Sequence, residues 1–295
     1  MATARPRVLV VYKQDAYQQY LKERRDPHLV RLLKAHHPAL VEMRQAHAGH
    51  IAALSSVIQT LKQLAVEFTL VARADLKVQG RYDLVVSVGG DGTFLKAARS
   101  VTRTPLLGVN SNPRYSEAVF CAATYRTFAR LCRLALSGQL PELRLYRLQV
   151  VLNGKQMPSQ ALNDLLIAHD DPATMSRYRL AVGKREEFQK SSGLWVATAA
   201  GSSSVVLAAG GTRLPWGAAT YQYRPRELYV GRLSRYRLKG GVLGAHALLR
   251  VTWLMRRGAV FIDGPHETIP LRFADQLEVQ LNMRDPLRVV GLTHR

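Results

Sequence analysis

The sequence has 295 residues, 47% of them hydrophobic, and 42 lysines and arginines against 21 acidic residues leave a formal net charge of +21. This length supports one large domain or two ordinary domains with a buried core. Such a charge attracts polyanions, including nucleotides, polyphosphate, nucleic acid and acidic lipid surfaces, but it equally suits a protein that is basic only for solubility. The basic residues form no long run and no zinc-finger spacing, so the sequence does not favour a specific nucleic-acid-binding module.

The compartment is predicted from what the sequence lacks. Cys121 and Cys132 have neither metal-ligand spacing nor the number expected of a disulfide framework, and residues 1–7 carry no secretory signal. Residues 191–212 are uncharged and long enough to span a bilayer, but they are rich in Ser, Thr and Gly, which favours a buried loop and helix instead. We therefore expect a cytoplasmic protein without a membrane anchor.

The first half of the chain alternates between strand-like and helix-like segments. Short runs rich in Val and Leu predict buried strands, and amphipathic stretches between them predict helices. Continuous apolar strands joined by helices are typical of a parallel sheet covered on both faces. The predicted strands are residues 8–12, 67–72, 83–89 and 105–109, and the predicted helices are 26–64 (broken near Pro38), 93–101 and 124–136.

The pattern changes after Pro141. Residues 143–152 alternate in polarity, and Asn153-Gly154 is a strong hairpin signal. Further short runs predict antiparallel strands at 161–168, 176–182, 228–230, 248–254, 259–262 and 277–281. We therefore predict an α/β domain with a mostly parallel, Rossmann-like sheet over residues 1–142, and a mostly antiparallel, β-rich domain over residues 143–295.

A glycine-rich loop follows the third predicted strand. In Gly89-Gly90-Asp91-Gly92-Thr93 the glycines allow the backbone to turn tightly and to approach phosphate oxygens. The helix that follows presents its N-terminal N–H groups to the same space. The carboxyl end of a strand in an open α/β sheet is where ligands bind. The P-loop pattern and G-x-G-x-x-G after the first strand are both missing, so the chain is neither a P-loop enzyme nor an ordinary dehydrogenase.

These residues resemble the GGDG loop shared by NAD kinases, diacylglycerol and sphingosine kinases, and phosphofructokinases. Three later segments resemble motifs of NAD kinases in particular: Asn163-Asp164 within 161–164, the stretch Ser192–Ser204, and Asp263-Gly264. Together with the glycine-rich loop they make four motifs, which occur in the family's order.

At two places the sequence differs from the common NAD kinase pattern and resembles a divergent branch of the family instead. That branch contains the mitochondrial NAD kinase and the plant NADH kinase. Asn110 begins Asn110-Ser-Asn-Pro-Arg-Tyr-Ser-Glu117, where most NAD kinases have G-x-N-x-G-x-L-G-F. Ser192 occupies the position of an aspartate that lies near the nicotinamide in most of the family. The preference between NAD and NADH is therefore open at this point.

The resemblance implies a kinase that transfers a phosphoryl group from ATP or polyphosphate to the adenosine ribose 2′-hydroxyl of NAD(H). It implies that Asp91 accepts the proton, or orients the hydroxyl and a metal-bound water. It implies no protein-bound metal, Mg²⁺ arriving with ATP, and a homodimer or higher oligomer. The phosphate or nucleotide contacts would be Gly89, Gly90, Gly92, Thr93 and Asn110, and the NAD contacts would be Asn163, Asp164, Ser192, Thr198, Gly201, Ser202 and Asp263.

The sequence leaves two alternative functions. A lipid or sphingoid kinase would share the glycine-rich loop but leave Asn163-Asp164 and Ser192–Ser204 unexplained. A nucleic-acid-binding protein would explain only the charge. A metal site at His47 and His50, one helical turn apart, has no evident third ligand, so we expect this pair on a solvated helix face.

Overall fold

The computed structural model describes residues 5–101, 103–232 and 234–293. The chain divides into two compact units. The first contains the residues up to Leu143 together with Arg288–Thr293, and the second contains Arg144–Leu287. The end of the last strand therefore belongs to the first unit, whereas the predicted second domain ran to the end of the sequence.

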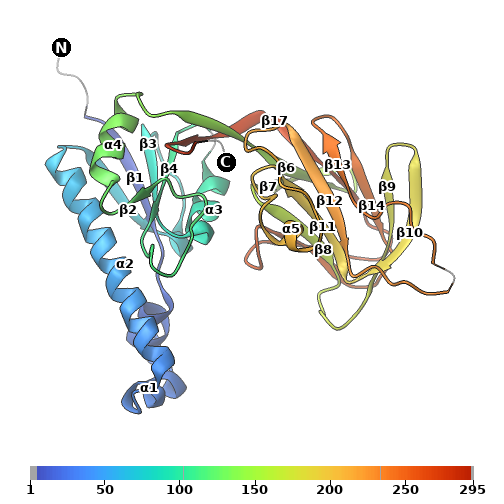
Figure 1. The fold of residues 1–295 in the computed structure, drawn as a ribbon, viewed down its shortest axis with the longest axis horizontal. Helices are drawn as coiled ribbons and strands as arrows, with labels where there is room; N and C mark the ends of the chain where they lie inside the picture. The colour runs from blue at the N-terminus through green and yellow to red at the C-terminus, as the bar shows by residue number, and fades with distance from the viewer. Residues whose placement is uncertain (1–4, 102, 233, 294–295) are drawn as a thin grey trace. The chain divides into compact units, whose positions relative to one another are not determined.

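The first unit is built on a parallel sheet with the strand order β2-β1-β3-β4 (Figure 1). Strands β1, β3 and β4 are rich in Val and Leu because they are buried on both faces of the sheet, whereas the edge strand β2 is mostly exposed. The end of β17 and the short β5 each pair with β4 in the parallel sense. The bounds are β1 Arg7–Tyr12, β2 Glu67–Ala72, β3 Leu84–Gly89, β4 Leu106–Asn110, β5 Ala123–Thr124 and β17 Gln276–Val290.

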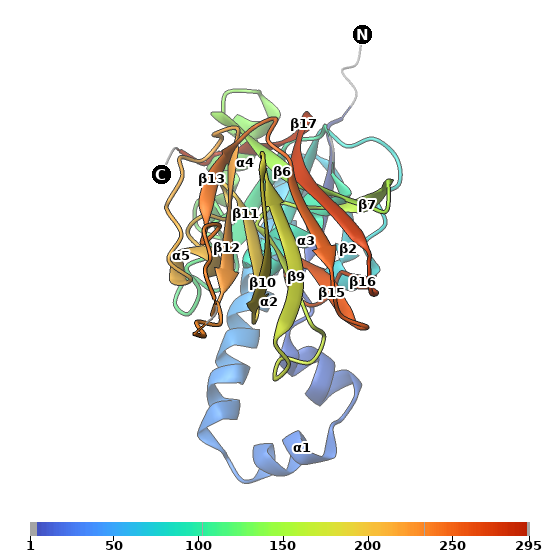
Figure 2. The same cartoon turned by 90° about the vertical axis from the view of Figure 1, so that its right-hand side faces the viewer.

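Helices α2 and α4 cover one face of this sheet and α3 covers the other (Figure 1). Helix α1 and the N-terminal part of α2 extend beyond the sheet (Figure 2). The predicted break at Pro38 is confirmed, because Pro38 is the first residue of α2. The bounds are η1 Tyr17–Glu23, α1 Pro27–Lys34, α2 Pro38–Gln63, η2 Arg73–Asp75, α3 Asp91–Ser100 and α4 Phe128–Leu136.

The second unit consists of antiparallel sheets around one apolar core (Figure 2). One sheet has the order β13-β12-β11-β8-β15-β16, and the other includes β10-β9-β14-β17 with β6 and β7. The bounds are β6 Glu142–Leu152, β7 Lys155–Ala161, β8 Asp164–Ala168, β9 Ser176–Val182, β10 Arg185–Ser191, β11 Gly193–Thr198, α5 Val205–Ala208, β12 Thr220–Arg226, β13 Gly241–Gly244, β14 Leu249–Trp253, β15 Gly258–Ile262 and β16 Thr268–Leu271.

The predicted fold class is confirmed, with two local corrections. Residues 228–230 are not a strand; they lie in an irregular segment in which the Tyr229 amide donates to the carbonyl of Lys190. The uncharged stretch 191–212 contains the buried strand β11 as well as a turn and the short helix α5. The Asn153-Gly154 hairpin is present, with positive φ at both residues, as a tight turn between antiparallel strands requires. Within the described ranges no helix is long and apolar enough to cross a membrane.

Candidate functional site

In the first unit, four chain segments meet at the carboxyl edge of the parallel sheet. Lys13 follows β1, Arg73 follows β2, Gly90 follows β3 and Ser111 follows β4. The pairs Tyr12–Ala72, Tyr12–Val88 and Gly89–Asn110 are in register, so these ends lie side by side. The chain leaves β1 toward α2 on one face and leaves β3 toward α3 on the other. Such a change of face is where open α/β sheets bind ligands.

The glycines of the turn after β3 have different surroundings. A Cβ on Gly89 would lie 2.8 Å from Cβ of the buried Thr93, so glycine is needed there for packing. A Cβ on Gly90 would be 3.4 Å from Ser116 Oγ, and one on Gly92 would be 3.6 Å from Arg73 Nη1. Gly90 is the half-buried N-cap of α3 and Gly92 is exposed in its first turn, where helix N–H groups favour an anion.

Asp91 is bound to a second segment of the same unit. Its Oδ2 accepts a hydrogen bond from the Val119 amide at 3.0 Å, and its Oδ1 accepts one from the Phe120 amide at 2.9 Å. Phe120 also stacks on Phe94 of α3, with ring centroids 5.2 Å apart. The half-buried carboxylate is therefore held in one orientation, and each oxygen keeps acceptor capacity for a further donor.

Asn110 supports the loop of residues 111–116. Its Nδ2 donates to the carbonyl of Ser116 at 2.8 Å, and its Oδ1 accepts from the Asn112 amide at 2.9 Å. The Ser111 amide donates to the carbonyl of Gly89 at 3.0 Å, which joins this loop to the glycine turn. The structure thus brings Gly89–Thr93 and Asn110 together.

Two cations beside the glycine turn were not singled out from the sequence. Arg73 approaches Gly92, and the pKa of Lys13 is lowered mainly by burial, with Asp15 opposing and Arg73 adding to the shift. A buried amine near another cation is stabilised by an anion. Among 42 basic residues nothing in the composition marks these two. Their position immediately after predicted strands is the signal that identifies them.

The prediction that His47 and His50 lie on a solvated face is wrong. They are 7% and 2% exposed, because η1 folds over α2. His47 Nδ1 lies 2.8 Å from Asp15 Oδ2, and its ring stacks on Tyr17. Burial lowers the pKa of His50 to about 4. In the part of the chain that the structure describes, no group of three or more His, Cys, Asp or Glu residues is arranged to hold a metal ion.

In the second unit, Asn163 and Asp164 form the turn that begins β8. Asp263 fixes this turn, since its carboxylate accepts hydrogen bonds from the amides of Leu162, Asn163 and Asp164 at 3.1, 2.8 and 3.2 Å. Asn163 Nδ2 donates to Asp164 Oδ2 at 2.8 Å and to Ser204 Oγ at 3.2 Å. The side chains of Asn163, Asp164 and Ser204 therefore form one polar cluster.

Asp164 is 5% exposed, and its pKa is raised to about 7. Burial is the main cause, and the charge of Asp263 adds to it, while the Ser204 hydroxyl opposes the shift. A carboxyl group with this pKa changes charge near neutral pH. It accepts hydrogen bonds from hydroxyl groups once it is ionised.

The remaining predicted residues of this unit make mostly internal contacts. Thr198 Oγ1 donates to the carbonyl of Leu162 at 2.6 Å and accepts from the Gly201 amide at 3.0 Å. A Cβ on Gly201 would lie 2.8 Å from Cα of Asn163 and closer still to its carbonyl. Ser202 Oγ accepts from the Leu214 amide at 2.9 Å. Ser192, in the bend between β10 and β11, donates its amide to the carbonyl of Arg226.

Comparison with known proteins agrees with this architecture. A family model described as the ATP-NAD kinase N-terminal domain matches residues 9–132. A probable NADH kinase of Oryza sativa is 37% identical over 219 residues, which cover 67% of each chain. The NADH kinase of Arabidopsis thaliana is 29% identical over 269 residues, covering 83% of this chain and 84% of the plant protein.

Solved structures show the same fold. An NAD kinase from Archaeoglobus fulgidus, crystallised with ATP, superposes with a TM-score of 0.67 over 96% of this chain and 92% of its own, at 21% identity. Yeast NADH kinase, in complex with NADH, gives a TM-score of 0.69 over 98% of this chain and 84% of its own, at 15% identity.

The chain belongs to the NAD kinase family. The expectation of an NAD kinase enzyme, and the resemblance to the branch that contains plant NADH kinases, are confirmed at this level. Neither the lipid-kinase nor the nucleic-acid alternative finds support among these relatives.

Proposed function

We propose that this protein transfers the terminal phosphoryl group of ATP to the adenosine ribose 2′-hydroxyl of NAD(H), giving NADP(H) and ADP. The observation that carries the proposal is the carboxyl edge of the first unit. There an oriented carboxylate, two glycine amides at a helix N-terminus and two cations lie together. Phosphoryl transfer requires positioning and stabilisation of spread negative charge, and these groups supply both.

The donor would bind through its phosphates. The amides of Gly90 and Gly92 and the positive end of α3 favour anionic oxygens, and Arg73 and Lys13 add full charges. Gly89, Thr93 and Asn110 would act indirectly by holding the turn and its neighbouring loop. The family resemblance implies Mg²⁺ bound with ATP as part of the donor, where it would neutralise phosphate charge. Polyphosphate is the alternative donor, and the same contacts would receive it.

The acceptor would be held by the polar cluster of the second unit. We assign Asn163 and Asp164 to the adenosine and its ribose hydroxyls, with the nucleotide pocket near Ser192, Thr198, Gly201 and Ser202. Thr198, Gly201 and Asp263 support this role through their hydrogen bonds and packing at the Asn163–Asp164 turn. Hydroxyl donors favour the ionised form of Asp164, so binding would release a proton near pH 7.

Asp91 would receive the proton. As the 2′-oxygen bonds to the terminal phosphorus, the bond to the bridging oxygen of the leaving ADP breaks, and the hydroxyl becomes acidic enough to transfer its proton to a carboxylate. A carboxylate fixed by the Val119 and Phe120 amides is oriented in advance. The other role proposed for Asp91 is to orient the hydroxyl and a metal-bound water.

Both oxidation states of the substrate would be accepted. Ser192 is neutral, so it offers no carboxylate to the positive nicotinamide ring of NAD. Two relatives carry the name NADH kinase, which supports NADH as a substrate of this protein as well. We expect NADH to be phosphorylated at least as fast as NAD. A cytoplasmic homodimer or larger homo-oligomer is the expected form.

The test is formation of NADP(H) from MgATP with NAD and NADH in parallel, comparing the wild type with Asp91→Asn. Loss of a positioned proton acceptor should reduce kcat by about 10²–10⁴-fold. Asp83→Asn is the matched control, because Asp83 also accepts a backbone amide, from Arg7, at the opposite edge of the sheet. Both variants must keep the circular dichroism spectrum of the wild type.

Three results would count against parts of this proposal. Equal rates for the Asp91→Asn and Asp83→Asn variants would remove the role of Asp91. Activity with polyphosphate and none with ATP would change the donor. If neither NAD nor NADH is phosphorylated with either donor, the proposed reaction is wrong, and diacylglycerol and sphingosine become the acceptors to assay.

A further inference from the structure

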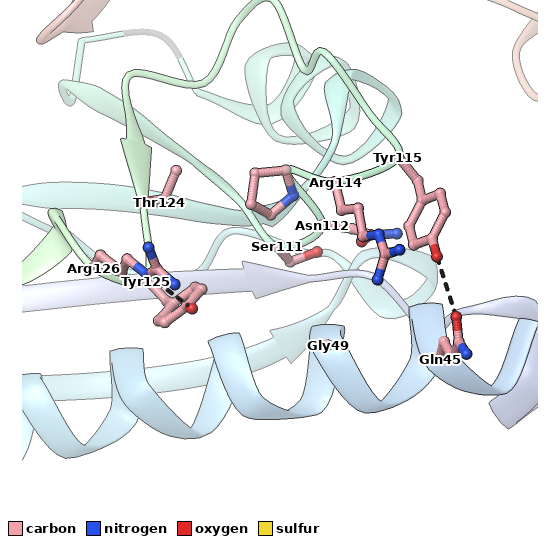
Figure 3. Close-up of a pocket in the computed structure, with 10 residues that line it drawn as sticks. Gln45, Gly49, Ser111, Asn112, Arg114, Tyr115, Thr124, Tyr125 and Arg126 are labelled. Carbon is pink, nitrogen blue, oxygen red and sulfur yellow. Dashed lines mark hydrogen bonds between the residues drawn. The ribbon is translucent and has the colours of Figure 1, made fainter. Parts of the chain in front are cut away.

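A groove in the first unit lies outside the catalytic residues proposed above. It has a volume of about 590 Å³, which is within the range of small-molecule sites. Helix α2 forms its floor, and the 111–116 loop and residues 124–126 form its walls (Figure 3). Helix α2 lies on the face of the sheet opposite α3, so the groove is separate from the helix N-terminus of the glycine turn.

Two tyrosine–arginine pairs line this groove. Tyr115 and Tyr125 are 52% and 39% exposed, so both rings offer surface that a ligand can contact. The Arg114 guanidinium lies 5.4 Å from the Tyr115 ring centroid, and that of Arg126 lies 5.5 Å from the Tyr125 centroid. Tyrosine rings and guanidinium planes both stack on planar ligands.

The groove is positively charged. Its lining contains Arg114 and Arg126 and no acidic residue. Within the described ranges these two guanidinium groups contact neighbouring tyrosines, and neither forms an ion pair with a carboxylate. Arginine without a carboxylate partner is suited to binding phosphate in a bidentate manner.

Polar groups at the bottom of the groove are left for a ligand. Ser111 is 2% exposed, and across the described residues its hydroxyl has no hydrogen-bond partner. Figure 3 shows Ser111 above α2, between the two tyrosine–arginine pairs. Gln45 Oε1 accepts a hydrogen bond from the Tyr115 hydroxyl at 3.1 Å, and its amide nitrogen is available as a donor. A buried hydroxyl without a partner costs free energy, which a ligand atom would recover.

We propose that this groove is a binding site for an adenine nucleotide. The base stacks on Tyr115 and Tyr125 and meets the polar atoms of Ser111 and Gln45, and the phosphates pair with Arg114 and Arg126. A polyanion without a base would not stack on the tyrosine rings, and a base without phosphates would not pair with the arginines. The proposal concerns binding alone, so it stands or falls independently of the kinase reaction.

Occupancy of the groove would act on the glycine turn through a shared loop. The 111–116 loop lines the groove, while its Ser111 amide is bonded to the carbonyl of Gly89. Ser116 Oγ lies next to Gly90. A nucleotide that fixes this loop would therefore fix the backbone of the turn as well.

The experiment is titration calorimetry with ADP in the absence of NAD(H). The variant Arg114→Ala/Arg126→Ala is compared with Arg130→Ala/Arg133→Ala, which removes the same charge from exposed positions on α4 outside the groove. We expect the groove variant to lose one ADP site per chain, or to bind there at least about tenfold more weakly, and the control to match the wild type. Equal isotherms for the two variants would overturn the proposal.

Two further measurements locate the site and test its chemistry. Photolabelling with 8-azido-ADP should modify a peptide that carries a groove residue, on α2 near Gln45 or at residues 111–115 or 124–126, and labelling confined to other positions would overturn the assignment. Tyr125→Leu retains both charges, so it should weaken ADP binding and leave tripolyphosphate binding unchanged. If tripolyphosphate displaces the label as well as ADP does, with no effect of Tyr125→Leu, the groove binds anions without recognising the base.

Discussion

The two units each contain a glycine turn that the family resemblance assigns to nucleotide binding, and the two turns differ in what the glycines face. In the first unit a Cβ on Gly90 or Gly92, at the N-terminus of α3, would contact only the side chains of Ser116 and Arg73. In the second unit Gly201 is packed against the backbone of Asn163, and Thr198 and Ser202 are engaged in internal hydrogen bonds.

The difference shows that glycine-rich sequence has two distinct physical uses. The turn after β3 leaves room for a ligand to approach the backbone. The turn after β11 allows two protein segments to approach each other, so that Asn163 and Asp164 are held in place. Substitutions of Gly90 or Gly92 should therefore affect ligands more than stability, and substitution of Gly201 should do the reverse.

The largest loss of stability is expected for Gly201→Ala. Its added Cβ overlaps the Asn163 backbone, which cannot move without breaking the hydrogen bonds from Asp263. Overpacking against backbone should lower the free energy of unfolding by about 2–3 kcal/mol. Urea unfolding followed by tryptophan fluorescence measures this directly, because Trp195, Trp216 and Trp253 all lie in the second unit. A change below about 0.5 kcal/mol would contradict the packing argument.

Asp263→Asn should have the next largest effect. The carboxylate accepts three backbone amides, and an asparagine side chain has only one oxygen to replace two. We expect a loss of about 1–3 kcal/mol, measured by the same fluorescence method. Asp263→Glu serves as the comparison, since it keeps the charge but displaces the oxygens. Wild-type stability in the Asn variant would show that Asp263 is not the support of the turn.

Much of the fold was predictable because the apolar pattern is strong. Strands β2 and β9 have the predicted bounds, and the break at Pro38 follows from the missing amide of proline. The prediction of a strand at residues 228–230 was wrong. These three residues have a strand-like composition, but a strand also needs a neighbouring strand to pair with, and the local sequence does not show whether one is present. Strands β10 and β12 were missed. Strand β10 is mostly charged and exposed, and polar or charged residues at every second position interrupt the apolar pattern of the mostly buried β12.

The candidate site was predictable only where it depends on backbone chemistry. The sequence Gly89–Thr93 predicts a turn after a strand, and the structure has a turn there. The burial of His47 and His50 was not predictable, because it depends on η1, a seven-residue segment with no strong periodicity. The opposite roles of Gly92 and Gly201 depend on tertiary contacts, which no local pattern encodes.

The pH dependence of stability gives a further prediction for the second unit. Because the folded-state pKa of Asp164 is raised to about 7, the folded protein retains a proton that the unfolded chain releases near pH 4. Stability from this group is therefore present at low pH and decreases as pH rises toward 7, by up to about 1.4 kcal/mol per pH unit. Asp164→Asn should remove this slope from the tryptophan-monitored unfolding curves between pH 5 and 7.

His50 provides the internal contrast, since it has the opposite sign and lies in the first unit. Its pKa is lowered to about 4, so the unfolded chain binds a proton that the folded protein does not, and stability decreases as pH falls below about 6.5. Ellipticity at 222 nm reports mainly on the helices of the first unit. Parallel slopes in the ellipticity and fluorescence curves would contradict the separate origins of the two effects.

The smallest change in stability is expected for Gly90→Ala. The new Cβ lies 3.4 Å from Ser116 Oγ, a side-chain atom that can rotate away. We expect a change in the free energy of unfolding within about 0.5 kcal/mol. The KM for ATP should rise, because the methyl group enters the space proposed for phosphate. An unchanged KM would place the donor phosphates away from this turn.

The pairing of β17 with β4 affects how the protein is made. Val289 lies beside Leu106 in the sheet of the first unit, and the whole second unit separates them in the chain. A ribosome therefore finishes the second unit before it supplies the strand that completes the first. Until then one side of β4 lacks its final partner, so the nascent first unit has an incompletely paired strand while the whole second unit is being synthesised.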